Sequence, residues 1–237
     1  MRRQRAVDAV SAAQERFEGV EIVYCDNHVL VAVKPPNMPS QADASGDCDL
    51  LTLMKAYVKQ KYQKPGNVYL GLVHRLDRPV GGLMAFARTS KAAARLSQQL
   101  RTHAMRREYL CVAQGEALEQ ARLADVLEYD DGAAKEAVLC YECLEAREGL
   151  SLLRVRLETG RKHQIRRQLQ HAGLPLWGDA RYGNGRPGQQ IALWGARLLL
   201  THPTSGAALT FTSLPPQAFP WQIFAHALFT DRSPEVD

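Results

Sequence analysis

The segment His74–Gly82 reads HRLDRPVGG and places a carboxylate between two arginines. Nearby positive charge lowers the pKa of a carboxylic acid, so Asp77 between Arg75 and Arg78 is expected to be ionised. A positioned, ionised carboxylate can act as a nucleophile or stabilise positive charge at a sugar or base. The proline and glycines that follow predict a tight turn with room for a ligand. A buried Arg–Asp pair that only fixes the loop is an equally open interpretation.

A second candidate segment is Thr159–Leu169, TGRKHQIRRQL, in which a glycine turn precedes a basic helix. The N-terminus of a helix carries free N–H groups and a partial positive charge, so phosphate binds well there. Arg166 follows the apolar Ile165 and is expected to point inward toward an acid. The residues expected to face solvent or RNA are Arg161, Lys162 and Arg167. An ordinary surface helix would show the same pattern.

Tyr109 lies in the expected strand 108–114. A tyrosine in a strand usually belongs to the core, although beside an extruded base it could stack and offer its hydroxyl. Cys140 and Cys143 form a single CxxC pair, whereas a structural zinc site usually needs four ligands. No second pair exists in the sequence, so we interpret these cysteines as packing residues and predict no metal site.

Charge is segregated along the 237 residues, whose net charge is +5. The ranges 78–107, 159–178 and 180–230 contain no acidic residue, while 116–158 holds eleven acids against five basic residues. If the acid-free segments share a face, that face would bind phosphate. An ordinary solvated face is an equally open interpretation.

Composition places the chain among globular proteins, with 46% hydrophobic and 23% charged residues. No apolar run is long enough to span a bilayer, and the N-terminus lacks the apolar core of a secretory signal. The expected location is therefore the cytoplasm. The odd number of cysteines, five, fits reduced thiols.

Several elements must position these residues. Alternating apolar residues predict strands at 21–25, 29–33, 68–74, 82–87, 108–114, 137–144 and 152–157, with two more within 191–212. Helical spacing predicts helices over 49–63, 90–101 and 161–171. We expect Asp47 or Asp49 to cap the first helix and Thr89 or Ser90 to cap the second. Gly173 is expected to end the third. Strands and helices do not alternate strictly, which favours an α+β fold over a doubly wound one. We expect a flexible lead-in over 1–19, one domain over 20–225 and a tail over 226–237.

Taken together and in order, the motifs VHRLD, TGRKHQIR, GDARYG and THP resemble the RluA family of pseudouridine synthases. The opening IVYCDNHVLVAVKPPNMPSQ also resembles the first hairpin and the Lys-Pro loop of that family, and the resemblance covers about residues 20 to 220. It implies a single α+β catalytic domain with a mixed, mostly antiparallel sheet, flanking helices and a central cleft. It also implies a short stand-alone member without an additional N-terminal RNA-binding domain.

The resemblance also implies the chemistry. Uridine in RNA is isomerised to pseudouridine after the base is flipped, with Asp77 as the nucleophile, attacking either the sugar or the uracil ring. Tyr109 matches the active-site tyrosine, Arg166 the basic residue paired with the aspartate, and Arg75 an arginine that helps to flip the base. The other expected substrate contacts are His74, Arg78, Arg161, Lys162, His163, Gln164, Arg167 and Leu176. His74 is interpreted mainly as a loop-fixing residue, and Asp179 as a loop-fixing carboxylate hydrogen-bonded to backbone near Tyr182.

Because the reaction adds and removes nothing, no redox cofactor, nucleotide or metal is expected. The expected partner is a ribosomal or transfer RNA stem-loop, and the chain is expected to be a monomer. Two departures from the family pattern, Pro79-Val80-Gly81 and Arg167-Gln168, lie where RNA would be gripped and leave the target RNA open. An inactive RNA-binding module is one alternative function. A glycosidase is another, but it would need two catalytic acids.

Overall fold

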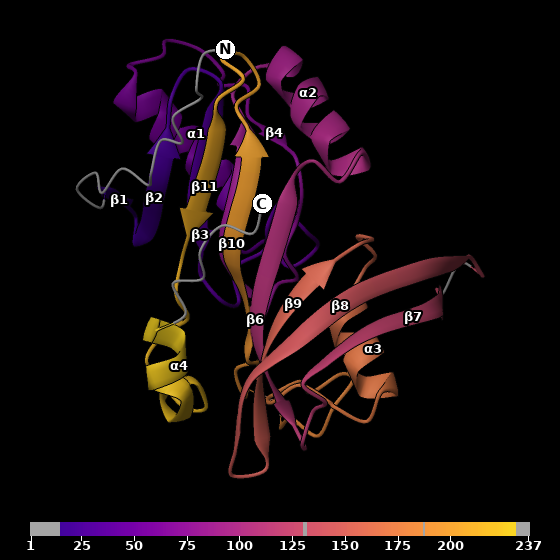
Figure 1. Cartoon of the computed structure of the whole chain (residues 1–237). Helices are drawn as coiled ribbons and strands as arrows, with labels where there is room; N and C mark the ends of the chain where they lie inside the picture. The colour runs from indigo at the N-terminus through magenta and orange to yellow at the C-terminus, as the bar shows by residue number, and fades with distance from the viewer. Residues whose placement is uncertain (1–14, 130–131, 187, 231–237) are drawn as a thin grey trace. The chain divides into compact units, whose positions relative to one another are not determined.

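The computed structural model describes residues 15–129, 132–186 and 188–230 (Figure 1). The chain forms two compact units, each made of two separate stretches of sequence. Unit 1 comprises residues up to Arg107 together with Gly195–Ser213, and unit 2 comprises Glu108–Trp194 together with the residues from Leu214 onward. Both units combine antiparallel strand pairs with helices, which confirms the predicted α+β class. The central cleft and the single domain over 20–225 stay predictions.

Unit 1 is a sheet in the order β1-β2-β3-β5-β10, to which β4 and β11 add at β5 and β10. Its strands are β1 (Glu15–Phe17), β2 (Val20–Cys25), β3 (Val29–Lys34), β4 (Gly71–Leu72), β5 (Gly81–Ala87), β10 (Leu193–Thr201) and β11 (Ala208–Thr212). The predicted turn between β2 and β3 is confirmed, because the Asp26 carboxylate accepts the N–H groups of His28 and Val29 at 2.8 and 2.7 Å.

The two helices of unit 1 begin where the capping residues predict. Helix α1 (Leu50–Lys61) is capped by Asp49, which accepts the Thr52 N–H at 3.0 Å. Helix α2 (Ser90–Arg101) is capped by Thr89, which accepts the Ala92 N–H at 3.1 Å. Each cap satisfies one of the N–H groups that a helix start leaves without an internal partner.

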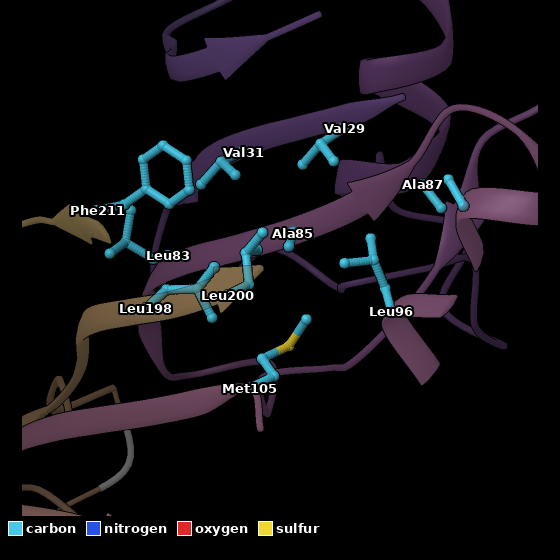
Figure 2. Packing of buried hydrophobic residues seen from close by; sticks show 11 residues of the cluster. Val29, Val31, Leu83, Ala85, Ala87, Leu96, Met105, Leu198, Leu200 and Phe211 are labelled. Carbon is cyan, nitrogen blue, oxygen red and sulfur yellow. The ribbon is translucent and has the colours of Figure 1, made fainter. Parts of the chain in front are cut away.

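A hydrophobic core holds α2 against the sheet of unit 1 (Figure 2). Alternate residues of each strand point to the same face, so β3, β5 and β10 each contribute side chains two residues apart. These are Val29, Val31, Leu83, Ala85, Ala87, Leu198 and Leu200, joined by Phe211 of β11. On the helix, Ala92 and Leu96 lie one turn apart and are both buried. Complete burial of a leucine such as Leu96 contributes roughly 2 kcal/mol.

The strand predicted over 68–74 is wrong for most of its length, because only Gly71–Leu72 form β4. One edge of β5 pairs with β3 along the whole strand. The other edge pairs with β10, and β4 pairs with β5 only at Phe86 and Ala87. Residues 73–80 therefore run as a loop toward β5.

Unit 2 contains an antiparallel sheet in the order β6-β9-β8-β7. Its elements are β6 (Arg106–Gln114), β7 (Gln120–Glu128), β8 (Ala134–Arg147), β9 (Leu150–Leu157), α3 (Gln164–His171), the 3-10 helix Trp221–Phe224 and α4 (Ala225–Thr230). Strand β7 was not predicted, because its burial alternates but its residue types do not: Asp125 lies on the less exposed face and Val126 on the exposed one. Backbone pairing to β8 along its whole length forms this edge strand.

Regular elements extend beyond both ends of the predicted domain. Glu15–Phe17 of the predicted lead-in form β1, which pairs with β2, and residues 1–14 lie outside the described residues. Residues 226–230 of the predicted tail belong to α4, and residues 231–237 again lie outside. No helix in the described part of the chain is long and apolar enough to cross a membrane.

Gly82 is required at the start of β5. Its φ is +124°, and a Cβ there would lie 2.3 Å from the backbone nitrogen of Gly195 in β10. We expect Gly82→Ala to lower the free energy of unfolding by about 3 kcal/mol or more, since strain and overlap with backbone add. Urea denaturation measures the change. Gly66→Ala is the control, because nothing lies within 4 Å of its added Cβ; equal midpoints for both variants would contradict the prediction.

Candidate active site

The predicted HRLDRPVG loop presents Asp77 at a turn in unit 1. Leu76 and Val80 are buried on either side, and the Val80 N–H donates to the Asp77 carbonyl at 3.0 Å. Asp77 itself is half-buried. The apolar neighbours therefore anchor a tight turn whose carboxylate lies between the core and the surface.

The backbone on both sides of Asp77 is held by two buried polar residues of the 34–40 segment. The Ser40 hydroxyl donates to the Leu76 carbonyl at 2.7 Å and accepts the Leu76 N–H at 3.2 Å. The Lys34 ammonium donates to the carbonyl of Arg78 at 3.0 Å. It also donates to the carbonyls of Pro35 and Met38 at 2.9 and 2.7 Å. Sequence reasoning did not assign either residue; the only signal was a lysine ending an apolar strand, just before two prolines.

The charge of Lys34 is part of the electrostatics around Asp77. The pKa of Lys34 is lowered to about 7, because burial and the Arg78 charge together outweigh the opposing effect of the Asp77 carboxylate. Three carbonyl acceptors match the three N–H groups of an ammonium. Lys34 is thus a positive group, close enough to Asp77 to interact with it, that is fixed by backbone geometry.

The two arginines beside Asp77 differ in their surroundings. Arg78 forms ion pairs with Asp43 at 3.7 Å and with Asp47, and donates to the Ser45 hydroxyl at 3.0 Å. Arg75 is exposed and forms no ion pair within the described part of the chain. An exposed, unpaired arginine next to the carboxylate is available to contact a ligand.

His74 is buried and holds the start of the loop against β5. Its Nε2 accepts the Ala85 N–H at 3.0 Å, so the proton of the neutral ring is on Nδ1. Burial and, to a smaller extent, the charge of Arg107 lower the pKa of His74 to about 3. These contacts support the interpretation of His74 as a loop-fixing residue, while a substrate contact stays a prediction.

In unit 2, Arg166 and Asp179 form a buried, bidentate ion pair. The guanidinium Nε and Nη2 donate to the two carboxylate oxygens at 2.8 and 2.7 Å. The same carboxylate accepts the N–H groups of Arg181 and Tyr182 at 3.0 and 3.1 Å. Burial alone would raise the pKa of Asp179, but the Arg166 guanidinium and these N–H groups outweigh it and lower that pKa. The predicted inward direction of Arg166 and the loop-fixing role of Asp179 are confirmed.

Other predicted contacts in unit 2 are buried. Gln164 is only 2% exposed, and its amide makes four hydrogen bonds, with Thr159, Arg161, Val138 and Gln168. That set uses the full capacity of the amide, so Gln164, the first residue of α3, fixes the helix start, while its substrate contact stays a prediction. Gln168 is also fully buried and donates to Asp125, Ala137 and Leu123. The expectation that Gln168 lies where RNA is gripped is therefore wrong.

Tyr109 and Leu176 are buried parts of the framework of unit 2. Tyr109 lies in β6 opposite Val155 of β9 and is 6% exposed. Leu176 forms an antiparallel backbone bridge with Ala113, and its neighbours Pro175 and Trp177 make backbone hydrogen bonds to Gln114 and Val112. The substrate roles expected of Tyr109 and Leu176 stay predictions.

The remaining basic residues of the TGRKHQIR segment are accessible. Arg161 and Lys162 are exposed, and Arg167 and His163 are half-buried. Arg161 donates to the Glu136 carbonyl at 2.9 Å, which ties the turn to β8. The expected exposure is confirmed for Arg161 and Lys162, whereas Arg167 is only half exposed.

Comparison with known proteins identifies relatives over most of the chain. The RNA pseudouridylate synthase family model matches residues 28–171. The ribosomal large subunit pseudouridine synthase D of Zymomonas mobilis is 32% identical over 221 residues, covering 84% of this chain and 70% of that protein. The tRNA pseudouridine synthase C of Yersinia pestis is 31% identical over 234 residues, covering 86% and 88%. The solved structure of human RNA pseudouridylate synthase domain containing 4 has the same fold, with a TM-score of 0.69 at 20% identity over 91% of this chain and 94% of that one.

Titration of Lys34 is expected to make stability depend on pH. The pKa of Lys34 is 10.5 in the unfolded chain and about 7 in the folded one. Between pH 7 and 10.5, the unfolded chain therefore binds a proton at Lys34 that the folded chain has released. The free energy of unfolding therefore rises with pH from about 7 to 10.5, and this contribution is lost as pH falls through 7. The difference between wild type and Lys34→Met should grow by more than about 1 kcal/mol from pH 7 to 10.

Urea denaturation at each pH measures this difference, and the exposed Lys59→Met provides the matched control. A difference that stays constant would show that the three carbonyls keep the proton on Lys34, contrary to the prediction.

Removing the charge of Asp179 is expected to destabilise unit 2 strongly. Asp179→Asn leaves the Arg166 guanidinium buried without its counter-charge, which should lower the free energy of unfolding by about 3–5 kcal/mol. Glu158→Gln breaks the exposed Arg122–Glu158 pair and should lower the free energy of unfolding far less, because water competes for both charges. Thermal and urea unfolding compare the two variants, and similar losses would rule out the special role of the buried pair.

Proposed function

The chain belongs to the RNA pseudouridylate synthase family and isomerises uridine in RNA to pseudouridine, and we propose that the Asp77 carboxylate is the nucleophile of this reaction. The observation that carries the proposal is the turn at Asp77. Its backbone is held on both sides by Lys34 and Ser40, while its carboxylate stays half-buried near a positive charge. A fixed, ionised carboxylate is what covalent catalysis at this site needs.

The reaction explains why one carboxylate suffices. The bond between the ribose and a uracil nitrogen breaks, and a bond from the same ribose carbon to a ring carbon of the same base forms. The proton on that ring carbon is released and the freed nitrogen gains one, so the isomerisation needs no oxidant or second substrate. Asp77 holds the detached half of the nucleotide covalently between the two steps, and its departure completes the exchange.

The other residues are proposed to handle the base and the RNA. Tyr109 stacks on the uracil and assists removal of the ring-carbon proton, and Arg75 occupies the space that the flipped base leaves. Arg75 suits this role because it is exposed next to the nucleophile. We further propose that Arg166, which forms a bidentate ion pair with Asp179, keeps the Asp77 carboxylate ionised.

We propose ribosomal or transfer RNA as the substrate, because the similar proteins from Zymomonas mobilis and Yersinia pestis carry those two names. A loop or bulge is the favoured target, since flipping an unpaired base costs least. A cytoplasmic location and a monomeric chain are parts of the same proposal, and they rest on the sequence.

Asp77→Asn tests the nucleophile. The amide has the shape of the carboxylate but not its charge, so turnover should fall by roughly 10³-fold or more while RNA binding is kept. Release of tritium from RNA labelled at carbon 5 of uridine measures turnover, with ribosomal and transfer RNA as separate substrates. Glu119→Gln, an exposed carboxyl ahead of β7, should match wild type. Undiminished tritium release by Asp77→Asn would refute the assignment.

A further inference from the structure

A cavity of about 190 Å³ lies in unit 2 where the start of α3 meets the end of β7 and the loop 178–186. It is lined by Lys162, His163, Arg167, Arg181, Tyr129 and Tyr182. Among the described residues of the lining, the exposed Glu128 is the only one with a carboxylate. Three permanent cations against one acid give the cavity a positive potential.

The three cations are not neutralised within the described part of unit 2. Elsewhere in this unit Arg122, Arg154 and Arg156 each pair with a glutamate at 2.8–3.1 Å. Lys162, Arg167 and Arg181 form no such pair with any residue that the structure describes. Unpaired cations gathered around one cavity are the arrangement expected for an anion site, because ordinary structural arginines find carboxylates.

Stacking on tyrosines holds two of these cations in place. The Arg167 guanidinium lies 5.3 Å from the centre of the Tyr129 ring, and Arg181 lies 5.4 Å from that of Tyr182. The Tyr182 hydroxyl is in turn 2.8 Å from Nδ1 of His163. A guanidinium that lies over a ring can still donate its N–H groups to an oxyanion.

Two further features fit an anion. Helix α3 has no side-chain cap at His163, unlike α1 and α2, so the partial positive charge at its start remains open. The buried hydroxyl of Tyr129 has no hydrogen-bond partner among the residues described. Buried polar groups are normally hydrogen-bonded, and a bound oxyanion would give this hydroxyl an acceptor.

The size of the cavity distinguishes a phosphate group from a whole nucleotide. Sites that enclose a small-molecule ligand usually measure roughly 300–1,000 Å³, well above the volume found here. We propose that this cavity binds one backbone phosphate of the RNA substrate, with Arg167, Arg181 and Lys162 as its donors. The inference rests on the proposed function, since RNA supplies the phosphodiester.

The test measures the affinity of wild type and of Arg167→Gln/Arg181→Gln for an RNA stem-loop over a range of salt concentrations. Losing one phosphate contact should weaken binding at least roughly tenfold and reduce the slope of log affinity against log salt by about 0.7–0.9. KM in the tritium assay should rise by a similar factor while kcat at saturating RNA stays unchanged. Arg122→Gln is the matched control, because this arginine of the same unit pairs with Glu158.

Lys162→Gln, at an exposed position, is a second variant that should weaken binding without affecting the fold. Wild-type affinity and salt slope in both variants would overturn the proposal. So would tight binding of inorganic phosphate or uridine monophosphate that competes with RNA, because the site would then serve a free anion. A wild-type protein that binds RNA through these residues but releases no tritium would instead refute the proposed function.

Discussion

The Lys34 ammonium is completely buried, and burying a charge is costly unless hydrogen bonds and opposite charge compensate for it. Three backbone carbonyls surround it, two from the loop that follows β3 and one from Arg78. Since all three acceptors must stay in place, the loop after β3 and the loop carrying Asp77 cannot move independently. The position of the proposed nucleophile therefore depends on satisfying one buried cation.

Unit 2 also contains a buried cation, which a carboxylate compensates instead of backbone carbonyls. Arg166 is buried against Asp179, whose carboxylate also accepts two backbone N–H groups of the following loop. The pair thus joins α3 to the GDARYG segment and orients Tyr182, over which the Arg166 guanidinium also stacks. Exposed pairs such as Arg122–Glu158 are worth far less, because water competes for both charges.

Charge segregation along the sequence has a structural counterpart in unit 2. Acids of the 116–158 range neutralise arginines on neighbouring strands, as Glu142 does for Arg154. In the acid-free range 159–178, Arg166 pairs with Asp179, whereas Lys162 and Arg167 form no ion pair with any described residue. An RNA substrate would supply the missing negative charge.

The sequence by itself determined the elements with local causes: the caps of α1 and α2, the turn at Asp26, and the buried alternation of β3 and β5. Through its motifs it also indicated the family and Asp77. Only the tertiary structure decided which acid pairs with Arg166, that Gln164 and Gln168 are buried, and that Tyr129 and Arg181 line a cavity with Lys162. The physical reason is range: a cap or turn is satisfied within about four residues. Gln168 instead reaches backbone 45 residues away, a partner that only the folded chain brings close.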